Sequence, residues 1–263
     1  MYAFTYERPA SLGQALSLLA VGGQAFAGGQ TLLASMKQRL LSPEQLVDLS
    51  ALSELQGIRQ SGDSWMVGAF TRHQEVAEHA GLRAALPGLA ALAAGIGDRQ
   101  VRAMGTLGGS VANNDPAACY PSAVLALGAT VHTDRRQIAA DDFFQGMYTT
   151  ALEPGEVITA IAFPKALRSA YAKFKQPASR FALAGVFVAQ TAAGVRVAVT
   201  GAGNGVFRHA GLEAALSKSF TPEAVADVVI DASELNADLH ASADYRAHLI
   251  KVQTQRAVQQ ALA

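Results

Sequence analysis

The sequence predicts an α+β fold, because strands and helices alternate along it without the regular period of a parallel α/β sheet. Its 263 residues are enough for one large domain or two ordinary ones, and 50% of them are hydrophobic. Two strand-like runs at 182–191 and 195–200 are joined by Ala193-Gly194, which is typical of a hairpin. A regular α/β protein would place a helix between such strands.

The other elements are predicted from capping residues, turn residues and the periodicity of apolar positions. In chain order they are a strand at 2–6, a helix at 11–20 opened by Ser11-x-x-Gln14, a strand at 24–27, a helix over 32–40, a helix start at Ser42-Pro43-Glu44, strands at 46–49 and 65–68, a short helix after Thr71-x-x-Gln74, a buried helix at 87–95, a strand at 157–163, a helix start at Thr221-Pro222-Glu223 and an amphipathic helix at 245–262. Pro164 and the basic segment 165–168 indicate a boundary, so we expect domains at 1–164 and 169–263.

Charge and composition exclude several partners. Lys+Arg and Asp+Glu balance at 21 each, so no basic excess is present to displace counterions from nucleic acid. Apolar runs such as 89–96 are shorter than the ~18 residues of a membrane span, and the first residues lack the pattern of a signal peptide. The single cysteine excludes a disulfide framework and a self-contained iron–sulfur cluster. We therefore expect a cytoplasmic protein without a membrane span or a nucleic-acid partner.

Two glycine-rich turns are the candidates for binding chemistry. Gly28-Gly29-Gln30-Thr31 lies between a predicted strand and a predicted helix, and Gly105–Ser110 is a second such turn. Glycine lets backbone N–H groups face a ligand oxygen, and a helix start adds free donors and a favourable dipole. Short polar side chains could bind sugar and phosphate groups, namely Thr31, Thr106, Ser110, Asn113 and Asn114. The residues alone predict either a nucleotide- or diphosphate-binding protein or two purely structural turns.

Other candidates have simpler interpretations. The stretch Val195–Gly205 runs from a strand into glycines, but Val206 stands at the third glycine position of a dinucleotide fingerprint. Cys119 could be a nucleophile, although a buried inert thiol is the commoner role. We interpret the remaining groups as structural, with His73 and His79 solvated or capping and with Asp141-Asp142 and Glu153/Glu156 as turn and cap residues.

Together the two turns resemble the FAD loops of a known family. Ala27-Gly-Gly-Gln-Thr-Leu32 resembles the first FAD loop of the flavoprotein (medium) subunits of molybdenum hydroxylases, which include aerobic carbon monoxide dehydrogenases and enzymes acting on xanthine and N-heterocycles. Gly105-Thr-Leu-Gly-Gly-Ser-Val-Ala-Asn-Asn-Asp-Pro116 resembles the second loop. The preceding Ile96–Arg102 and the opening Phe4-x-Tyr-x-Arg-Pro9 fit as well, so the resemblance covers essentially the whole chain.

This resemblance implies a particular version of the α+β fold. A two-subdomain FAD-binding domain of the PCMH type, divided near 50–60, would precede a small α+β C-terminal domain of the carbon monoxide dehydrogenase flavoprotein type. Leu152 resembles a residue that lies against the isoalloxazine, and Lys175 a lysine near the flavin ring. The residues implied to bind FAD are Ala27, Gly28, Gly29, Gln30, Thr31, Leu32, Thr106, Gly108, Gly109, Ser110, Asn114, Asp115, Cys119, Leu152 and Lys175.

The sequence departs from the family pattern at two places. Cys119 stands where members usually carry an aspartate that contacts the cofactor, and a thiol is a much weaker acceptor. The segment Pro177–Ala184 keeps its hydrophobic part but lacks the common Gly-Asp before it.

The implied function is electron transfer within a complex. Electrons from substrate oxidation at a molybdenum-cofactor large subunit would pass through a 2Fe–2S small subunit to FAD and then to an external acceptor. The subunits would assemble as a dimer of heterotrimers, and this chain would contribute no catalytic or metal-binding residue. Two alternatives stay open, a stand-alone flavoprotein oxidoreductase that shares the fold and a non-enzymatic nucleotide-binding scaffold in which Cys119 marks the loss of FAD.

Overall fold

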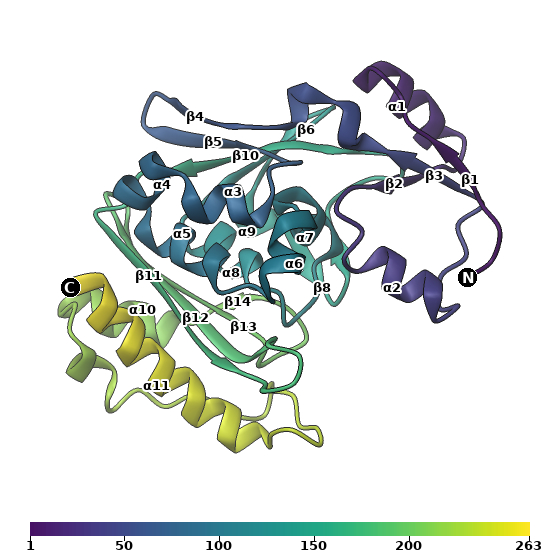
Figure 1. Cartoon of the computed structure of the whole chain (residues 1–263). Coiled ribbons are helices and arrows are strands. Elements are labelled where there is room, and N and C mark those ends of the chain that lie inside the picture. Colours follow the sequence, from purple (N-terminus) through teal and green to yellow (C-terminus); the bar gives the residue numbers. More distant parts are fainter.

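Three main β-sheets and the helices packed on them form the protein, and the computed structural model describes all residues from 1 to 263 (Figure 1). A small parallel sheet lies at the N-terminal end, and two antiparallel sheets follow it. Helices and strands are thus mixed without a regular βαβ repeat, which confirms the predicted α+β class. No helix combines the length and the apolar composition needed to cross a lipid bilayer.

The N-terminal sheet has the strand order β1-β3-β2, and all its pairs are parallel. Its elements are β1 (Thr5–Glu7), α1 (Leu12–Ala20), β2 (Gln24–Phe26), α2 (Leu32–Lys37) and β3 (Gln45–Asp48), followed by the short turns η1 (Leu49–Ala51) and η2 (Ser53–Leu55). Helix α1 begins as predicted, because the Ser11 side chain accepts a hydrogen bond from the Gln14 N–H. Ala15 and Leu19 of α1 pack with Val47 in a small core.

The second sheet has the order β4-β5-β10-β6-β7 and is antiparallel throughout. Its strands are β4 (Ile58–Ser61), β5 (Ser64–Gly68), β6 (Thr130–Thr133), β7 (Gln137–Ala139) and β10 (Ile158–Pro164). The chain between β5 and β10 also forms α3 (His73–Glu78), α4 (Ala80–Ala85), α5 (Pro87–Ala94), α6 (Arg99–Met104), α7 (Leu107–Asn113), α8 (Tyr120–Ala126), α9 (Ala140–Phe143) and a hairpin of β8 (Phe144–Gly146) and β9 (Thr149–Thr150).

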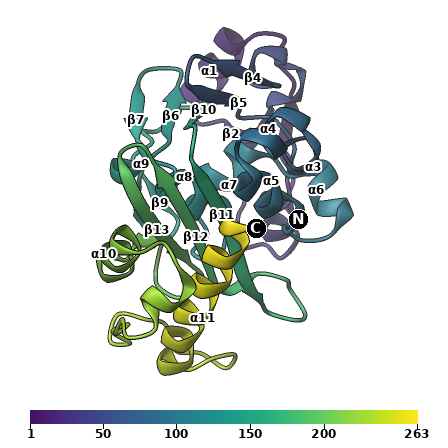
Figure 2. The ribbon, with the colours of Figure 1, turned by 90° about the vertical axis from the view of Figure 1, so that its left-hand side faces the viewer.

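The third sheet is antiparallel in the order β11-β12-β13-β14 and contains the predicted hairpin. Its elements are β11 (Arg168–Lys175), β12 (Ala182–Thr191), β13 (Gly194–Thr200) and β14 (Phe207–Arg208), with α10 (Ala210–Lys218), η3 (Pro222–Val225) and α11 (Ala243–Leu262) after them. Helix α11 packs on β11 and β12, while α5 and α8 approach the sheet from the preceding part of the chain (Figure 2).

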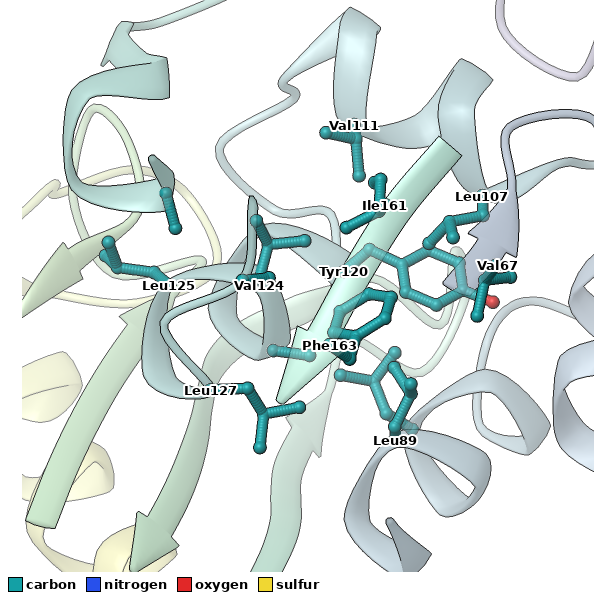
Figure 3. Close-up of a cluster of buried hydrophobic side chains, with 14 of the residues drawn as sticks. Val67, Leu89, Leu107, Val111, Tyr120, Val124, Leu125, Leu127, Ile161 and Phe163 are labelled. Atoms are coloured by element: carbon teal, nitrogen blue, oxygen red, sulfur yellow. The ribbon is translucent and has the colours of Figure 1, made fainter. Parts of the chain in front are cut away.

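One continuous core joins the second and third sheets. Tyr120 and Val124 of α8 lie beside Phe163 and Ile161 of β10, with Val67 and Leu107 next to the Tyr120 ring (Figure 3). Tyr171 and Phe187 of the third sheet belong to the same cluster. Because buried apolar area stabilises by about 25 cal/mol per Å², this shared core holds the two sheets together.

The anchor of α11 is a buried arginine. Arg246 is 3% exposed, and its guanidinium donates hydrogen bonds to the carbonyl oxygens of Leu183 (2.7 Å) and Gly201 (2.8 Å). It also pairs with the Asp238 carboxylate at 2.7 Å. A buried guanidinium requires such partners, so these bonds set where the C-terminal helix lies on the sheet.

Two of the differences from the predicted elements lie in the N-terminal sheet. Helix α2 ends at Lys37 rather than including Leu40, since Arg39 adopts a left-handed conformation with φ of 62°. The segment Ser42-Pro43-Glu44 does not start a helix. The Glu44 carbonyl accepts a hydrogen bond from Thr5 N–H, so this segment pairs with the first strand instead. At Ser42–Glu44 a tertiary contact therefore overrides a local helical signal, whereas α2 ends in a local turn in which Leu40 N–H donates to the Ser35 carbonyl at 2.9 Å.

The remaining differences concern the ends of elements. The first strand covers only Thr5–Glu7, and Thr221-Pro222-Glu223 opens a single 3₁₀ turn instead of a longer helix. The helix after Thr71 begins at His73, where the Glu75 carboxylate accepts from Arg72 N–H at 2.6 Å. The Thr71 hydroxyl donates instead to the Gly57 carbonyl, so it does not cap the helix.

Candidate functional site

The two predicted glycine loops are in direct contact. A Cβ atom added to Gly28 would lie 2.1 Å from the Met104 carbonyl oxygen and 2.7 Å from Gly105 Cα. A Cβ atom added to Gly109 would lie 3.8 Å from the Ala27 Cβ. Only glycine permits the first of these approaches, because any side chain would overlap the opposite backbone. The loops therefore form one continuous surface, although they are far apart in the sequence.

The first loop leaves helix donors free. Gly29 has φ of +68°, a conformation that glycine adopts without strain, and Gln30 donates from its side chain to the Gly28 carbonyl at 3.1 Å. Gln30 and Thr31 are exposed, and Thr31 makes no side-chain cap on α2. The Leu33 N–H already donates to the Gly29 carbonyl at 3.1 Å, whereas the N–H groups of Leu32 and Ala34 have no partner in the chain and can bind a ligand.

Strand-like pairing holds the second loop. Leu107 N–H donates to the Thr71 carbonyl at 3.0 Å, and His73 N–H donates to the Gly105 carbonyl at 2.9 Å. Thr106 is buried and caps α7 by accepting from Gly109 N–H at 3.2 Å. Gly109 itself is exposed and Ser110 is half-exposed. Thr106 thus positions the loop, while Gly109 and Ser110 face outward.

Two buried side chains support the loop from beneath. His73 is 5% exposed, and its Nε2 lies 2.5 Å from the position of a Cβ on Gly105. Its ring lies 5.2 Å from the ring of Tyr120, which is fully buried. Burial lowers the pKa of His73 to about 4, with a smaller effect from the Arg102 charge. The interpretation of His73 as a solvated or capping residue is therefore wrong, since its neutral ring is a packing element.

Asn114 and Asp115 connect the second loop to the β8–β9 hairpin. Asn114 ends α7 in a left-handed conformation with φ of 44°, and its Nδ2 donates to the carbonyls of Gly146 and Thr149 at 2.8 Å each. The Asp115 carboxylate accepts from Ala117 N–H at 2.8 Å and from the Tyr148 hydroxyl at 3.3 Å. These bonds give both residues a structural role in this surface.

Cys119 is buried and lies beside a lysine that the sequence analysis did not select. The Lys173 ammonium donates to Cys119 Sγ at 3.3 Å, to the Gly95 carbonyl at 2.9 Å and to the Arg180 carbonyl at 3.1 Å. Lys173 stands two residues before Lys175 on the same strand, and side chains at this spacing share a face. This spacing is the signal by which the sequence could have identified Lys173. Cys119 is 6% exposed, in agreement with a buried cysteine rather than an accessible nucleophile.

The last two predicted site residues stand apart from the glycine loops. Leu152 is half-buried against the central core, and its N–H approaches the Thr150 hydroxyl at 3.4 Å. Lys175 is exposed and is the last residue of β11, directly after a shift in the pairing register at Phe174. No hydrogen bond or ion pair links either residue to the two loops.

The other polar candidates are structural. His79 caps α4 by accepting from Leu82 N–H at 3.2 Å, which agrees with the capping interpretation. Glu156 is buried and paired with Arg136 at 3.0 Å, and the hydrogen bond from Arg136 lowers its pKa to about 2. The strand β13 leads into a turn in which Thr200 donates to the Pro116 and Ala118 carbonyls. No three His, Cys, Asp or Glu side chains gather closely enough to hold a metal ion.

Comparison with known proteins matches residues 2–166 to the family described as the FAD binding domain in molybdopterin dehydrogenase. The chain is 37% identical to the carbon monoxide dehydrogenase medium chain of Hydrogenophaga pseudoflava, over 99% of this chain and 97% of the relative. It is 32% identical to the glyceraldehyde dehydrogenase medium chain of Sulfolobus acidocaldarius, over 97% and 96%.

Solved structures agree with these relatives. Carbon monoxide dehydrogenase from Hydrogenophaga pseudoflava has a chain with a TM-score of 0.91 and 35% identity, covering 99% of this chain and 98% of that chain. Quinoline 2-oxidoreductase from Pseudomonas putida has a chain with a TM-score of 0.89 and 30% identity, covering 99% and 97%.

The His73 environment predicts acid sensitivity. The unfolded chain takes up a proton at the ordinary His pKa of 6.5, whereas the folded chain does so only near pH 4. The free energy of unfolding should fall by roughly 3 kcal/mol as the pH drops through this window, and His73 should contribute no further loss below it. Urea unfolding followed by the fluorescence of Trp65, the only tryptophan, measures this slope.

His73→Phe keeps a ring in place and should remove this part of the slope. His240→Gln, at an exposed position, is the matched control and should retain it. Identical pH slopes for His73→Phe and the wild type would contradict the assignment.

Proposed function

Because the chain belongs to the family of FAD-binding medium subunits of the molybdenum hydroxylases, we propose that its paired glycine loops hold the diphosphate of FAD. The chain is an FAD-binding oxidoreductase subunit whose role is electron transfer. The observation that carries the proposed site is the close approach of Gly28 to Met104 and Gly105, which makes one surface from both loops.

The residues at this surface fit a diphosphate. Gly29, Gln30 and Thr31 lie at the uncapped start of α2, and the exposed Gly109 and Ser110 lie in the first turn of α7. Backbone N–H groups at a helix start and the positive end of the helix dipole favour phosphate oxygens. Glycine at position 109 leaves free the space that a side chain would fill. Ala27, Leu32, Thr106 and Gly108 would shape the surface from below.

We propose that the flavin end of FAD lies toward Cys119, Lys173, Leu152 and Lys175. FAD supplies the chemistry of accepting and releasing electrons, and the chain supplies position and electrostatics. Lys173 places a positive charge beside Cys119, without a carboxylate within ion-pair distance. Asn114 and Asp115 would act by holding the β8–β9 hairpin against the end of α7. In this proposal 1–164 forms the FAD-binding domain, divided near 50–60, and 169–263 the C-terminal domain.

The chain is one subunit of a multi-subunit oxidoreductase, as the medium chains among its relatives are. We propose that its partners are a molybdenum-cofactor large subunit and a 2Fe–2S small subunit in a dimer of heterotrimers. The single cysteine supports this division, because iron–sulfur clusters need several thiolate ligands. Electrons would enter from the iron–sulfur subunit and leave to an external acceptor. The cytoplasmic location stays a prediction.

Purification of the tagged chain from its host tests the proposed partners. We expect a yellow complex in which one co-purified subunit contains 2Fe–2S clusters and another contains molybdenum, with the mass of two heterotrimers. A yellow chain that elutes alone would support the stand-alone flavoprotein instead. A colourless chain that does not respond to added FAD would contradict both flavin functions.

Substitution of Gly109 tests the diphosphate site. Gly109→Asp places a negative charge where we locate the diphosphate, so FAD affinity should fall by more than about tenfold relative to Gly109→Ala. The alanine variant is the matched control, because its Cβ makes the same 2.9 Å approach to Thr106 Oγ1 without the charge. FAD titration by flavin fluorescence measures both affinities. Equal affinities would place the diphosphate elsewhere.

Substitution of Cys119 tests the flavin end of the site. Cys119→Asp restores the residue usual in the family and gives the Lys173 ammonium an ionic partner in a half-buried position. We expect FAD to bind as tightly as in the wild type or more tightly, whereas the neutral Cys119→Ser should show no gain. Weaker FAD binding by the aspartate variant would contradict the placement of Cys119 at the cofactor.

A further inference from the structure

Two arginines meet at the turn between α5 and α6. Arg102 of α6 donates from its Nη1 to the carbonyl oxygens of Ile96 (2.9 Å) and Gly97 (3.4 Å). Arg180, in the loop between β11 and β12, donates from its own Nη1 to the same Gly97 oxygen at 3.3 Å. Because both Nη1 atoms contact one oxygen, the two guanidinium groups lie close together, although their residues are far apart in the sequence.

A third positive charge lies at the same turn. The Lys173 ammonium donates to the Gly95 carbonyl at 2.9 Å and to the Arg180 carbonyl at 3.1 Å, in addition to its contact with Cys119. These bonds use its three hydrogens, so Lys173 adds a charge here but no free donor. The turn 95–97 is therefore contacted by three cations from three different parts of the chain.

No carboxylate neutralises these cations. Arg102, Lys173 and Arg180 take part in none of the ion pairs of the chain. The neighbouring carboxylate of Asp98 caps α6 by accepting from Val101 N–H at 2.9 Å, and it forms no ion pair either. Like charges at close range repel each other, so an anion bound between them would be stabilising.

The donors left free on the two arginines reach solvent. Each guanidinium uses only Nη1 within the chain, so the hydrogens on Nε and Nη2 are available to a ligand. Arg180 is exposed and Arg102 is half-buried. Nε and Nη2 of Arg102 are not among the buried polar atoms that lack a partner, so both are open to solvent. An approaching anion can therefore contact donors of both residues.

The fold holds Arg180 in position. Its backbone is left-handed with φ of 64°, which is uncommon for a residue with a long side chain. Its N–H donates to the Gln176 carbonyl at 2.8 Å, and its carbonyl accepts from Lys173. A group that is already ordered loses less entropy when a ligand binds, so these bonds prepare Arg180 for binding.

We propose that Arg102 and Arg180 together bind the phosphate or diphosphate group of a small-molecule ligand. Guanidinium groups present paired donors that match phosphate oxygens, and two of them can contact different oxygens of one group. Lys173 would contribute its charge. The diphosphate of FAD is assigned to the glycine loops, so this is a second site. Only the position of the ligand beside the flavin end rests on the proposed function, whereas binding itself does not.

Inorganic pyrophosphate is the probe. Isothermal titration of the full chain, with FAD present throughout, should show saturable binding whose affinity falls as salt is added, since exposed charges are screened. Absence of pyrophosphate binding at millimolar concentration would overturn the proposal. Binding that occurs only without FAD would overturn it as well, because the two arginines would then belong to the FAD site.

Three variants assign the binding to these arginines. Arg180→Gln should weaken pyrophosphate binding by about tenfold, since each partly exposed charged contact contributes modestly. Arg180→Lys keeps the charge but loses the planar fork of donors, so it should recover only part of the affinity. Arg256→Gln removes an exposed arginine of α11 and is the matched control, which should bind pyrophosphate like the wild type.

FAD titration of the same variants separates this inference from the proposed function. Arg180→Gln should bind FAD as tightly as the wild type, and thermal unfolding establishes that each variant is folded. A wild-type chain that binds pyrophosphate but no FAD would contradict the proposed function and support the arginine site. Equal pyrophosphate affinities of folded Arg180→Gln and Arg256→Gln would place the probe elsewhere and overturn the proposal.

Discussion

The packing of the Gly28 backbone against the Met104–Gly105 peptide is the constraint on which the site depends. Two loops from different parts of the sequence form one surface only because Gly28 carries no side chain at the point of contact. Everything behind this contact holds it in place, from the strand-like bonds of Thr71 and His73 to the Thr106 cap on α7. The surface that faces outward is correspondingly simple, consisting of exposed glycine, short polar side chains and free helix donors.

The second loop is connected to the rest of the molecule through α8. His73 packs between Gly105 and Tyr120, and Tyr120 belongs to the core that continues through Phe163 into the third sheet. Cys119 directly precedes this tyrosine and meets Lys173 of that sheet. The proposed diphosphate and flavin ends of the site are therefore linked by one close-packed core. Close-packed protein interiors have low compressibility, so they transmit strain from one side to the other.

The local signals in the sequence were reliable where an element is stabilised by its own residues. The Ser11 cap, the hairpin of β12 and β13 and the long α11 all match the predicted positions. The helix start at Ser42-Pro43-Glu44 was wrong because pairing with Thr5 drew the segment toward the sheet. The predicted cap at Thr71 was wrong because the Thr71 hydroxyl donates to the Gly57 carbonyl. Gly57 is 14 residues away in the chain, so no local pattern indicates this bond. Capping residues and proline describe what a segment can do, whereas competing long-range hydrogen bonds decide what it does.

By itself, the sequence determined the α+β class, the two glycine turns and the departure at Cys119, because turn chemistry and residue identity act within a few neighbouring positions. Tertiary structure alone decided that the two turns touch, that His73 is buried, that Lys173 is the partner of Cys119 and that Asn114 holds the β8–β9 hairpin. Each of these facts depends on groups far apart in the chain. Their approach is set by packing of the shared core and by the need of buried polar groups for partners, which no local pattern encodes.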